Sequence, residues 1–198
     1  DGGLDVLSFA EQKLVDLFTN RDFDFSFSKQ PILNLEKDSK GDFWLFSINT
    51  LYKIDLNADG EIEMVFKQKI DNQPVRYIAL ADIDGDGNIW IGVNDEILKT
   101  YVDNGRHLIR TQSVSQKLIF RRNTRINKIL LKENEVWIAT DRGLCRYYKN
   151  EDAVKIYVHD EADERSISQD FITDLCVTPS KILIASTFNG INIYQPST

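Results

Sequence analysis

The sequence has few of the residues on which most catalytic and metal sites depend. Two histidines, His107 and His159, occur among its 198 residues, and each stands alone in a polar segment. No Gly-x-Ser-x-Gly, His-Glu-x-x-His or glycine-rich phosphate-binding motif is present. Since the motifs of the common hydrolytic and phosphoryl-transfer mechanisms are missing, we expect this chain not to be an enzyme.

Cysteine is equally scarce, and two cysteines cannot form the disulfide framework of a small secreted domain. Cys145 and Cys176 both lie in apolar runs, as buried free thiols do. Two buried free thiols are therefore the favoured interpretation, and a single bridge between them is the alternative.

Excess positive charge and long apolar runs are absent as well. The chain has 24 basic and 31 acidic residues and a net charge of −7. Nucleic-acid-binding proteins show a basic surface instead, and anionic membranes attract basic segments. No run of about 18 apolar residues occurs, which excludes a membrane-spanning helix, and no signal peptide is recognisable. We expect neither a nucleic-acid partner nor direct contact with a membrane.

What the chain does contain is a block that recurs every 46 or 47 residues. The segments DFWLFS, NIWIGV and EVWIAT carry a tryptophan at the same place, and KILIAS carries a leucine there. These residues are Trp44, Trp90, Trp137 and Leu183, and a second series with the same spacing is Leu4, Leu51, Ile97, Leu144 and Ile191. Such self-similarity indicates a repeat architecture. The tryptophans are predicted to pack between sheets as core residues, with sugar-stacking platforms as the alternative.

One repeat has the pattern of four short strands separated by polar turns. Strands are expected at 126–131, 136–140, 144–148 and 153–159, with Gly143 in a turn and Gly190 at its place in the next copy. Four antiparallel strands are the composition of a propeller blade. The predicted fold class is all-β: a β-propeller built from four-stranded antiparallel blades, with about four blade repeats.

The chain is predicted to form a single β-propeller segment over residues 1–198. The expected repeats are a partial blade at 1–30, blades at 31–74, 75–125 and 126–171, and a partial blade at 172–198. This division favours a segment of a larger propeller, and a closed four-bladed ring is the alternative. Because an open array has raw sheet edges, a homodimer is an expected partner state.

The N-terminal segment is ambiguous by local propensity. Residues 10–17 have apolar side chains at helix-like spacing and several good helix formers. Residues 3–18 nevertheless overlay residues 143–158 without a gap. The repeat therefore predicts a hairpin of a third and an outer strand here, and no helix.

With these segments in place, the repeat resembles the two-component regulator propeller repeat. ADIDGDGNIWIG, VWIATDRGLCRYY and YVHDEADERSISQDFITDLCV carry the likeness, which covers nearly the whole chain. The resemblance implies a non-enzymatic periplasmic sensor segment of a hybrid two-component system. It also implies an oligosaccharide from polysaccharide breakdown as ligand, and further blades and a domain linked to a histidine kinase as partners. Two alternatives stay open: a structural or dimer-forming segment with the ligand bound elsewhere, and a propeller lyase.

Binding residues are expected in the loops on one face of the propeller, because the sheets hold those loops rigidly. Amide, charged and aromatic side chains there suit sugar hydroxyls, through hydrogen bonds and ring stacking. The candidate ligand-binding residues are Asn72, Gln73, Arg76, Asn94, Asp95, Arg121, Arg122, Arg125, Asp141, Arg142, Gln169, Asp170, Phe188 and Asn189. The three arginines at 121, 122 and 125 suit a uronate or sulfate group. Pairing of these arginines with neighbouring acids is the alternative.

Two Asp-rich segments alternate carboxylates before a glycine, as calcium-binding loops do. The candidate metal ligands are Asp55, Asn57, Asp59 and Glu63 in one segment, and Asp82, Asp84 and Asp86 in the other. An EF-hand needs a glutamate at its twelfth position, where these segments have Phe66 and Val93. Plain turns are the favoured interpretation, so we expect no cofactor, and bound calcium is the alternative.

Overall fold

The structure is a computed structural model in which every described element is a β-strand paired antiparallel with its neighbour. The described residues are 5–8, 13–16, 32–37, 41–47, 50–56, 62–69, 78–84, 86, 88–93, 96–103, 108–113, 124–180 and 183–194. In this part of the chain no helix is long and apolar enough to cross a membrane. The prediction of an all-β chain of antiparallel sheets is confirmed.

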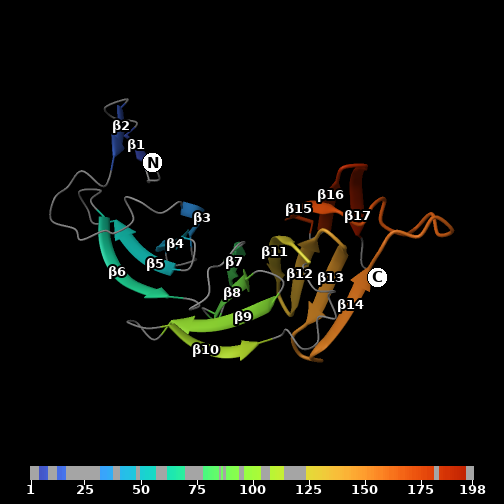
Figure 1. Cartoon of the computed structure of the whole chain (residues 1–198), viewed down its shortest axis with the longest axis horizontal. Coiled ribbons are helices and arrows are strands. Elements are labelled where there is room, and N and C mark those ends of the chain that lie inside the picture. Colours follow the sequence, from blue (N-terminus) through green and yellow to red (C-terminus); the bar gives the residue numbers. More distant parts are fainter. Residues whose placement is uncertain are drawn as a thin grey trace. The chain divides into compact units, whose positions relative to one another are not determined.

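The chain divides into two compact units, of which the first comprises Asp1–Val75 and Gly105–His107. Its described elements are a hairpin and a four-stranded sheet whose strands pair in chain order (Figure 1). The hairpin consists of β1 (Asp5–Ser8) and β2 (Lys13–Asp16), and the sheet of β3 (Ile32–Lys37), β4 (Phe43–Ser47), β5 (Thr50–Leu56) and β6 (Ile62–Lys69). In the hairpin Leu7 lies opposite Leu14. The predicted N-terminal hairpin is confirmed over its described residues.

The second unit comprises Arg76–Asn104 and Leu108–Thr198 and contains three of the described sheets. The first sheet consists of β7 (Ile78–Ile83), β8 (Asn88–Val93), β9 (Glu96–Asp103) and β10 (Leu108–Ser113). The second consists of β11 (Ile126–Lys132), β12 (Glu135–Thr140), β13 (Gly143–Tyr148) and β14 (Ala153–Tyr157). The third consists of β15 (Ile172–Val177), β16 (Leu183–Thr187) and β17 (Gly190–Tyr194). The sheets of the chain thus have two, three or four described strands. A uniform four-stranded blade, the number of blades and the repeat boundaries stay predictions.

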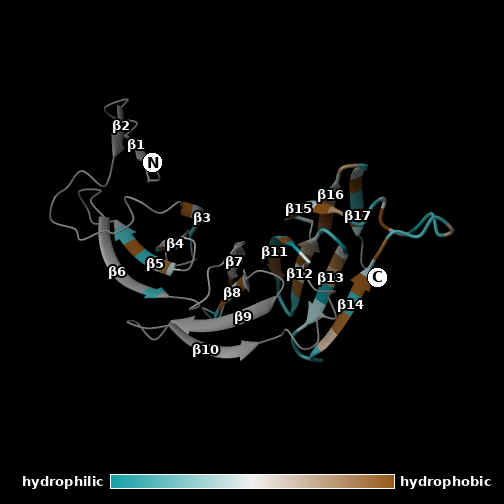
Figure 2. Cartoon of the chain, in the orientation of Figure 1, coloured by the Kyte–Doolittle hydropathy of each residue, from teal (hydrophilic) through white to brown (hydrophobic). Residues whose placement is uncertain are grey.

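The tryptophans lie on the second strand of their sheets and are core residues, as predicted. Trp44, Trp90 and Trp137 are 2%, 4% and 0% exposed. Trp90 packs in one cluster with Ile138 of β12, and Trp137 packs in another with Leu183 of β16. Figure 2 shows apolar residues along the strands β11 to β17 and hydrophilic residues on the connection after β14. Burial between successive sheets therefore holds the second unit together.

The last copy of the block departs from the predicted alignment by one residue. Trp137 lies three residues before Thr140, which pairs with Gly143 at the turn into the third strand. In the next sheet Thr187 pairs with Gly190, so the residue at the tryptophan's place is Ile184. The prediction that Leu183 takes this place is wrong.

The cause is the length of the hairpin before the second strand. Leu131 pairs with Val136 in the β11–β12 hairpin, which leaves four residues between the partners. At the equivalent place in the β15–β16 hairpin Val177 pairs with Leu183, which leaves five. A shift of one residue turns every side chain of a strand to the other face. Leu183 consequently points toward Trp137 in the core.

The two cysteines are free thiols, but their surroundings differ. Cys145 is buried and Cys176 is exposed. Burial raises the pKa of the Cys145 thiol to about 12. The prediction of free thiols is confirmed, and the prediction that both are buried is wrong. Cys176 of β15 pairs with Ile184 of β16, so the two side chains lie on the same face of the sheet. This face is opposite to the one on which Leu183 packs against Trp137.

Candidate functional site

Two turns on neighbouring sheets have the same construction. In the β12–β13 turn the Thr140 hydroxyl donates to the Gly143 carbonyl over 2.7 Å and accepts from the Arg142 N–H at 3.0 Å. Thr187 makes the same two bonds in the β16–β17 turn, over 3.2 Å and 3.0 Å. These bonds hold Arg142 and Asn189 at the exposed tips of the two turns.

The connection between β14 and β15 is bonded to both turns. The Gly143 N–H donates to the Asp170 carbonyl over 2.7 Å. The Asn189 amide donates to the Ser168 carbonyl over 3.4 Å, and the Ser168 N–H donates to Asn192 Oδ1 over 2.8 Å. The two turns and the connection therefore form one continuous edge of the second unit.

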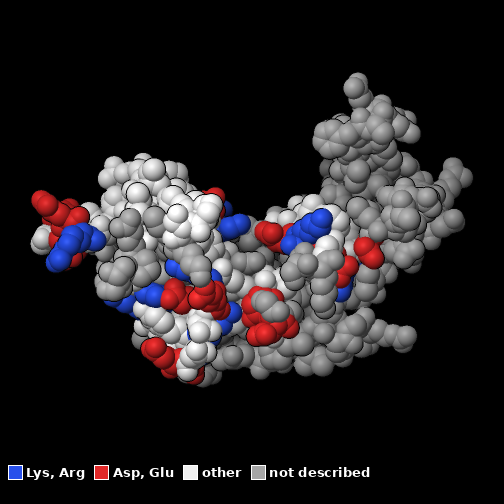
Figure 3. Space-filling view, turned by 180° about the vertical axis from the view of Figure 1, so that it is seen from behind, with Lys and Arg blue, Asp and Glu red and all other residues white. Residues whose placement is uncertain are grey.

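The connection projects from the sheets but is fixed at its base. Its tip carries acidic and basic atoms at the left edge of Figure 3. The His159 N–H donates to Asp170 Oδ1 over 2.6 Å, and His159 Nδ1 lies 2.7 Å from the Ile167 carbonyl. The Asp160 N–H donates to the Ser166 hydroxyl over 3.0 Å, and Ile167 is only 8% exposed. The base of the loop thus has a defined shape before any ligand binds.

An exposed aromatic pair lies on this edge. The rings of Phe171 and Phe188 are 4.9 Å apart, and Phe188 is 75% exposed. Beside it in the chain, Asn189 reaches the connection through its amide. The Oε1 atom of Gln169 is buried and has no partner among the described residues. An exposed apolar ring next in the chain to an exposed asparagine is suited to a ligand with both a flat apolar face and hydroxyl groups.

The described candidates for ligand binding gather on this edge. Arg125 and Asp141 are joined twice: the Asp141 N–H donates to the Arg125 carbonyl over 3.0 Å, and the Arg125 N–H donates to Asp141 Oδ1 over 2.9 Å. The structure places these candidates on the edge: Arg125, Asp141, Arg142, Gln169, Asp170, Phe188 and Asn189. The others lie outside the described residues: Asn72, Gln73, Arg76, Asn94, Asp95, Arg121 and Arg122.

Among the predicted metal ligands, Asp84 makes the contacts of a turn residue. Its carboxylate accepts from the Asn88 N–H at 2.8 Å and from the Trp90 indole N–H at 3.0 Å. Lys149 Nζ lies 3.5 Å from the same carboxylate. Burial raises the pKa of Asp84, but these donors and the lysine charge outweigh it and hold the pKa below its ordinary value.

The other candidate ligands do not gather into a site that the structure describes. Asn57 and Asp59 lie outside the described residues. Within the described part, no three His, Cys, Asp or Glu side chains lie close enough together to hold a metal ion. Calcium binding at Asp55, Glu63, Asp82 and Asp86 therefore stays a prediction.

Sequence reasoning missed a half-buried arginine that joins two sheets. Arg146 of β13 forms an ion pair with Glu135 and donates to the Tyr194 hydroxyl of β17 over 2.6 Å. Its guanidinium centre lies 5.0 Å from the Trp137 ring and 4.4 Å from the Tyr148 ring. Burial lowers the pKa of Arg146, but the interactions with Glu135, Tyr157 and Tyr194 together outweigh it and hold the pKa above its ordinary value. Only the arginine's place opposite Trp137 in neighbouring strands could have signalled this contact.

Comparison with known proteins shows a β-propeller fold. No protein-family model matches the chain, and no curated protein matches it. The chain is similar to the extracellular domain of the hybrid two-component system BT4673 from B. thetaiotaomicron, with a TM-score of 0.72 and 17% identity, over 97% of this chain and 24% of that one. The chain is also similar to a catalytically inactive virginiamycin B lyase from Staphylococcus aureus, with a TM-score of 0.59 and 12% identity, over 89% of this chain and 59% of the lyase. A third similar structure is the β-propeller domain of Cps50 from Myceliophteria thermophila, with a TM-score of 0.59 and 13% identity, over 84% of this chain and 54% of that domain.

At these identities the likeness extends to the fold and no further. The chain spans about a quarter of the length of that extracellular domain, since it covers 24% of it.

Proposed function

We propose that this chain is a segment of an extracellular, periplasmic sensor propeller of a hybrid two-component system. The support is the repeat motif together with the similarity to BT4673, whose TM-score of 0.72 exceeds the 0.59 of the lyase. The proposed partners are further propeller blades and the kinase-linked domain of the same protein. In this role the segment binds a ligand and passes the binding energy to the rest of the sensor, and it performs no chemistry.

The proposed ligand is an oligosaccharide bound on the loop edge of the second unit. The observation that supports it most directly is the Phe171–Phe188 pair, because Phe188 is 75% exposed and is followed in the chain by the exposed Asn189. A sugar ring has an apolar face that stacks on an aromatic ring and hydroxyls that bond to amides. Arg125 and Arg142 are exposed on the same edge and suit an acidic sugar.

A lyase activity gains no support from the described histidine. His159 is bonded to the connection through its main-chain N–H and lies 2.7 Å from the Ile167 carbonyl through its ring. A general base must instead reach its substrate directly or through one water. His107 lies outside the described residues.

The test is calorimetric titration against neutral and uronate-containing oligosaccharides. We expect one class to bind, and Phe188→Ala to weaken that binding at least tenfold with little change in melting temperature, because the ring is mostly exposed. Leu35→Ala is the control, since Leu35 is an exposed apolar residue on β3 of the first unit. Equal affinity of the Phe188→Ala variant and the unchanged protein would refute the proposed site.

A further inference from the structure

Strand β11 contains a bulge at Asn127. The pairing of β11 with β12 passes from Ile126 directly to Lys128, so Asn127 is the extra residue of the bulge. A bulge re-aims the side chain of its extra residue. The Asn127 amide donates to the Ile172 carbonyl of β15 over 2.7 Å, and β11 and β15 belong to different sheets. Asn127 therefore ties sheet β11–β14 to sheet β15–β17 through its side chain.

On its own sheet, Asn127 lies beside the segment that carries two exposed arginines of the loop edge. Its neighbour Ile126 pairs with Thr140, whose hydroxyl accepts from the Arg142 N–H. The Arg125 N–H donates to the side chain of Asp141 in the same turn over 2.9 Å. One end of the Asn127 bond is thus fixed relative to Arg125 and Arg142, which form the arginine side of the edge.

On the neighbouring sheet, the bond ends beside the aromatic pair. Ile172 follows Phe171 in the chain and pairs with Thr187, whose hydroxyl accepts from the Asn189 N–H. The centres of the Phe171 and Phe188 rings are 4.9 Å apart. The other end of the Asn127 bond is thus fixed relative to these two phenylalanines, which form the aromatic side of the edge.

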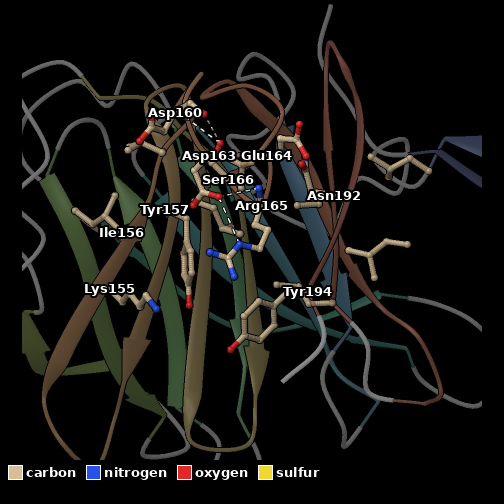
Figure 4. A pocket seen from close by; sticks show the side chains of 17 residues that line it. Lys155, Ile156, Tyr157, Asp160, Asp163, Glu164, Arg165, Ser166, Asn192 and Tyr194 are labelled. Carbon is tan, nitrogen blue, oxygen red and sulfur yellow. Dashed lines mark hydrogen bonds and ion pairs between the residues drawn. The ribbon is translucent and has the colours of Figure 1, made fainter. Parts of the chain in front are cut away.

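The connection between β14 and β15 is bonded in part to itself and in part to sheet β11–β14. The Ser166 hydroxyl donates to the Asp160 carbonyl and accepts from the Asp160 N–H, each over 3.0 Å (Figure 4). The Gly143 N–H donates to the Asp170 carbonyl over 2.7 Å, and this bond needs no side chain. The bond from Asn127 reaches the end of the same connection, but it forms only while residue 127 has a donor. A single side chain thus controls this contact between the sheets.

We propose that Asn127 is a positioning residue that sets the spacing between the arginine side and the aromatic side of the edge. It thereby selects an acidic oligosaccharide that contacts both sides, an inference that rests on the proposed oligosaccharide site. A sugar ring on Phe188 and a carboxylate on Arg142 are two contacts of one ligand. Such contacts add affinity only when the geometry lets them form together. Without the Asn127 bond the spacing is no longer fixed, so the ligand keeps the ring contact and loses the carboxylate contact.

The test is a double-mutant cycle, measured by calorimetric titration of the whole chain with oligosaccharides. The acidic probes are oligogalacturonate, alginate and hyaluronate oligosaccharides, and the neutral probes are gluco- and galacto-oligosaccharides. We expect an acidic probe to bind, and Asn127→Ala and Arg142→Ala each to weaken its binding at least tenfold. In the Asn127→Ala background, Arg142→Ala should weaken the remaining binding less than twofold, whereas Phe188→Ala should still weaken it. If Asn127 acted only on stability, the effect of Arg142→Ala would be the same in both backgrounds, because independent effects add.

Two further variants separate the hydrogen bond from other effects of the substitution. Asn127→Asp keeps the volume of the side chain but cannot donate at pH 7, so it should behave like Asn127→Ala. Thr173→Val is the matched control, because Thr173 is the extra residue of the bulge in β15. The Thr173 hydroxyl lies 2.7 Å from the Ser186 hydroxyl of its own sheet, so its loss should leave the effect of Arg142→Ala complete.

The outcomes distinguish this inference from the proposed function. If an acidic oligosaccharide binds and Arg142→Ala has the same effect with and without Asn127, the inference is wrong and the sugar site stands. Binding of neutral probes alone, or a Thr173→Val variant that behaves like Asn127→Ala, leads to the same conclusion. If no oligosaccharide binds the unchanged protein, the proposed site is wrong and the role of Asn127 is refuted with it.

Discussion

At the scale of single residues, Asp84 shows how one carboxylate can fix a turn and a core ring together. Its oxygens accept from the main-chain N–H groups of Asp86 and Asn88 and from the Trp90 indole. The Lys149 ammonium approaches both the carboxylate, at 3.5 Å, and the Trp90 ring, at 5.2 Å. An aspartate that serves several donors in this way has its oxygens engaged within the protein. This arrangement favours the turn interpretation of the DIDGDG segment over a calcium loop.

We predict that Asp84→Ala lowers the free energy of unfolding by about 2 kcal/mol at pH 7, because the buried Trp90 indole N–H and the half-buried Asn88 lose their acceptor. The folded pKa of Asp84 is lowered. Its contribution is therefore complete above the unfolded pKa of about 3.9 and is lost as the pH falls through the lower folded pKa. Urea denaturation over a pH series measures this. Asp86→Ala is the control, since Asp86 is exposed in the same turn, and equal losses in both variants would contradict the prediction.

Gly143 and Gly190 occupy the same position in two neighbouring sheets, at the start of the third strand. Both have positive φ, +127° and +110°, which side chains rarely adopt. A Cβ added at Gly143 would lie 2.6 Å from the Tyr157 carbonyl oxygen, whereas one at Gly190 would meet nothing within 4 Å. We predict that Gly190→Ala costs about 1 kcal/mol through its backbone conformation, and that Gly143→Ala costs at least about 2 kcal/mol more because of the clash. Chemical denaturation measures both, and equal costs would show that the Tyr157 contact does not decide the effect.

At the scale of elements, the strands were predictable because turn residues and apolar alternation mark them. The expected strands at 126–131, 136–140 and 144–148 agree with β11, β12 and β13 to within a residue or two at each end. The register of β16 was not predictable from the tryptophan spacing, because the added residue lies in the hairpin before it. The spacing of Thr187 and Gly190, which equals that of Thr140 and Gly143, was the signal for the shift.

The register of β16 yields a prediction that separates the two alignments. Leu183 is fully buried against the Trp137 cluster, and Ile184 is half-buried on the opposite face. We expect Leu183→Ala to cost about 2–5 kcal/mol of unfolding free energy, as buried leucines do. Ile184→Ala should cost less than about 1.5 kcal/mol, since less of its side chain leaves water on folding. Urea denaturation measures both variants, and a larger loss for Ile184→Ala would restore the alignment of Leu183 with the tryptophans.

At the scale of the whole molecule, the period of the tryptophans was sufficient to predict the β-sheets and the buried tryptophans, but it did not predict the contacts within the candidate site. Sequence reasoning placed Phe188 and Asn189 in a loop, yet it missed Phe171, which supports the Phe188 ring from a different segment. It also missed the contact of Arg146 with Tyr194, because these residues are 48 positions apart. Contacts between repeats depend on how the sheets stack, and one sequence contains no direct signal for that stacking.

A ligand that binds only the folded chain must also stabilise it. With free oligosaccharide at 100 times its dissociation constant, we predict a gain of about 2.7 kcal/mol in the free energy of unfolding. The gain should depend on Phe188, so the Phe188→Ala variant should gain no more than about 1.4 kcal/mol at the same sugar concentration if its affinity falls at least tenfold. Urea denaturation with and without the sugar measures both values, and Leu35→Ala should gain as much as the unchanged protein. An equal gain in the Phe188→Ala variant would place the sugar elsewhere on the molecule.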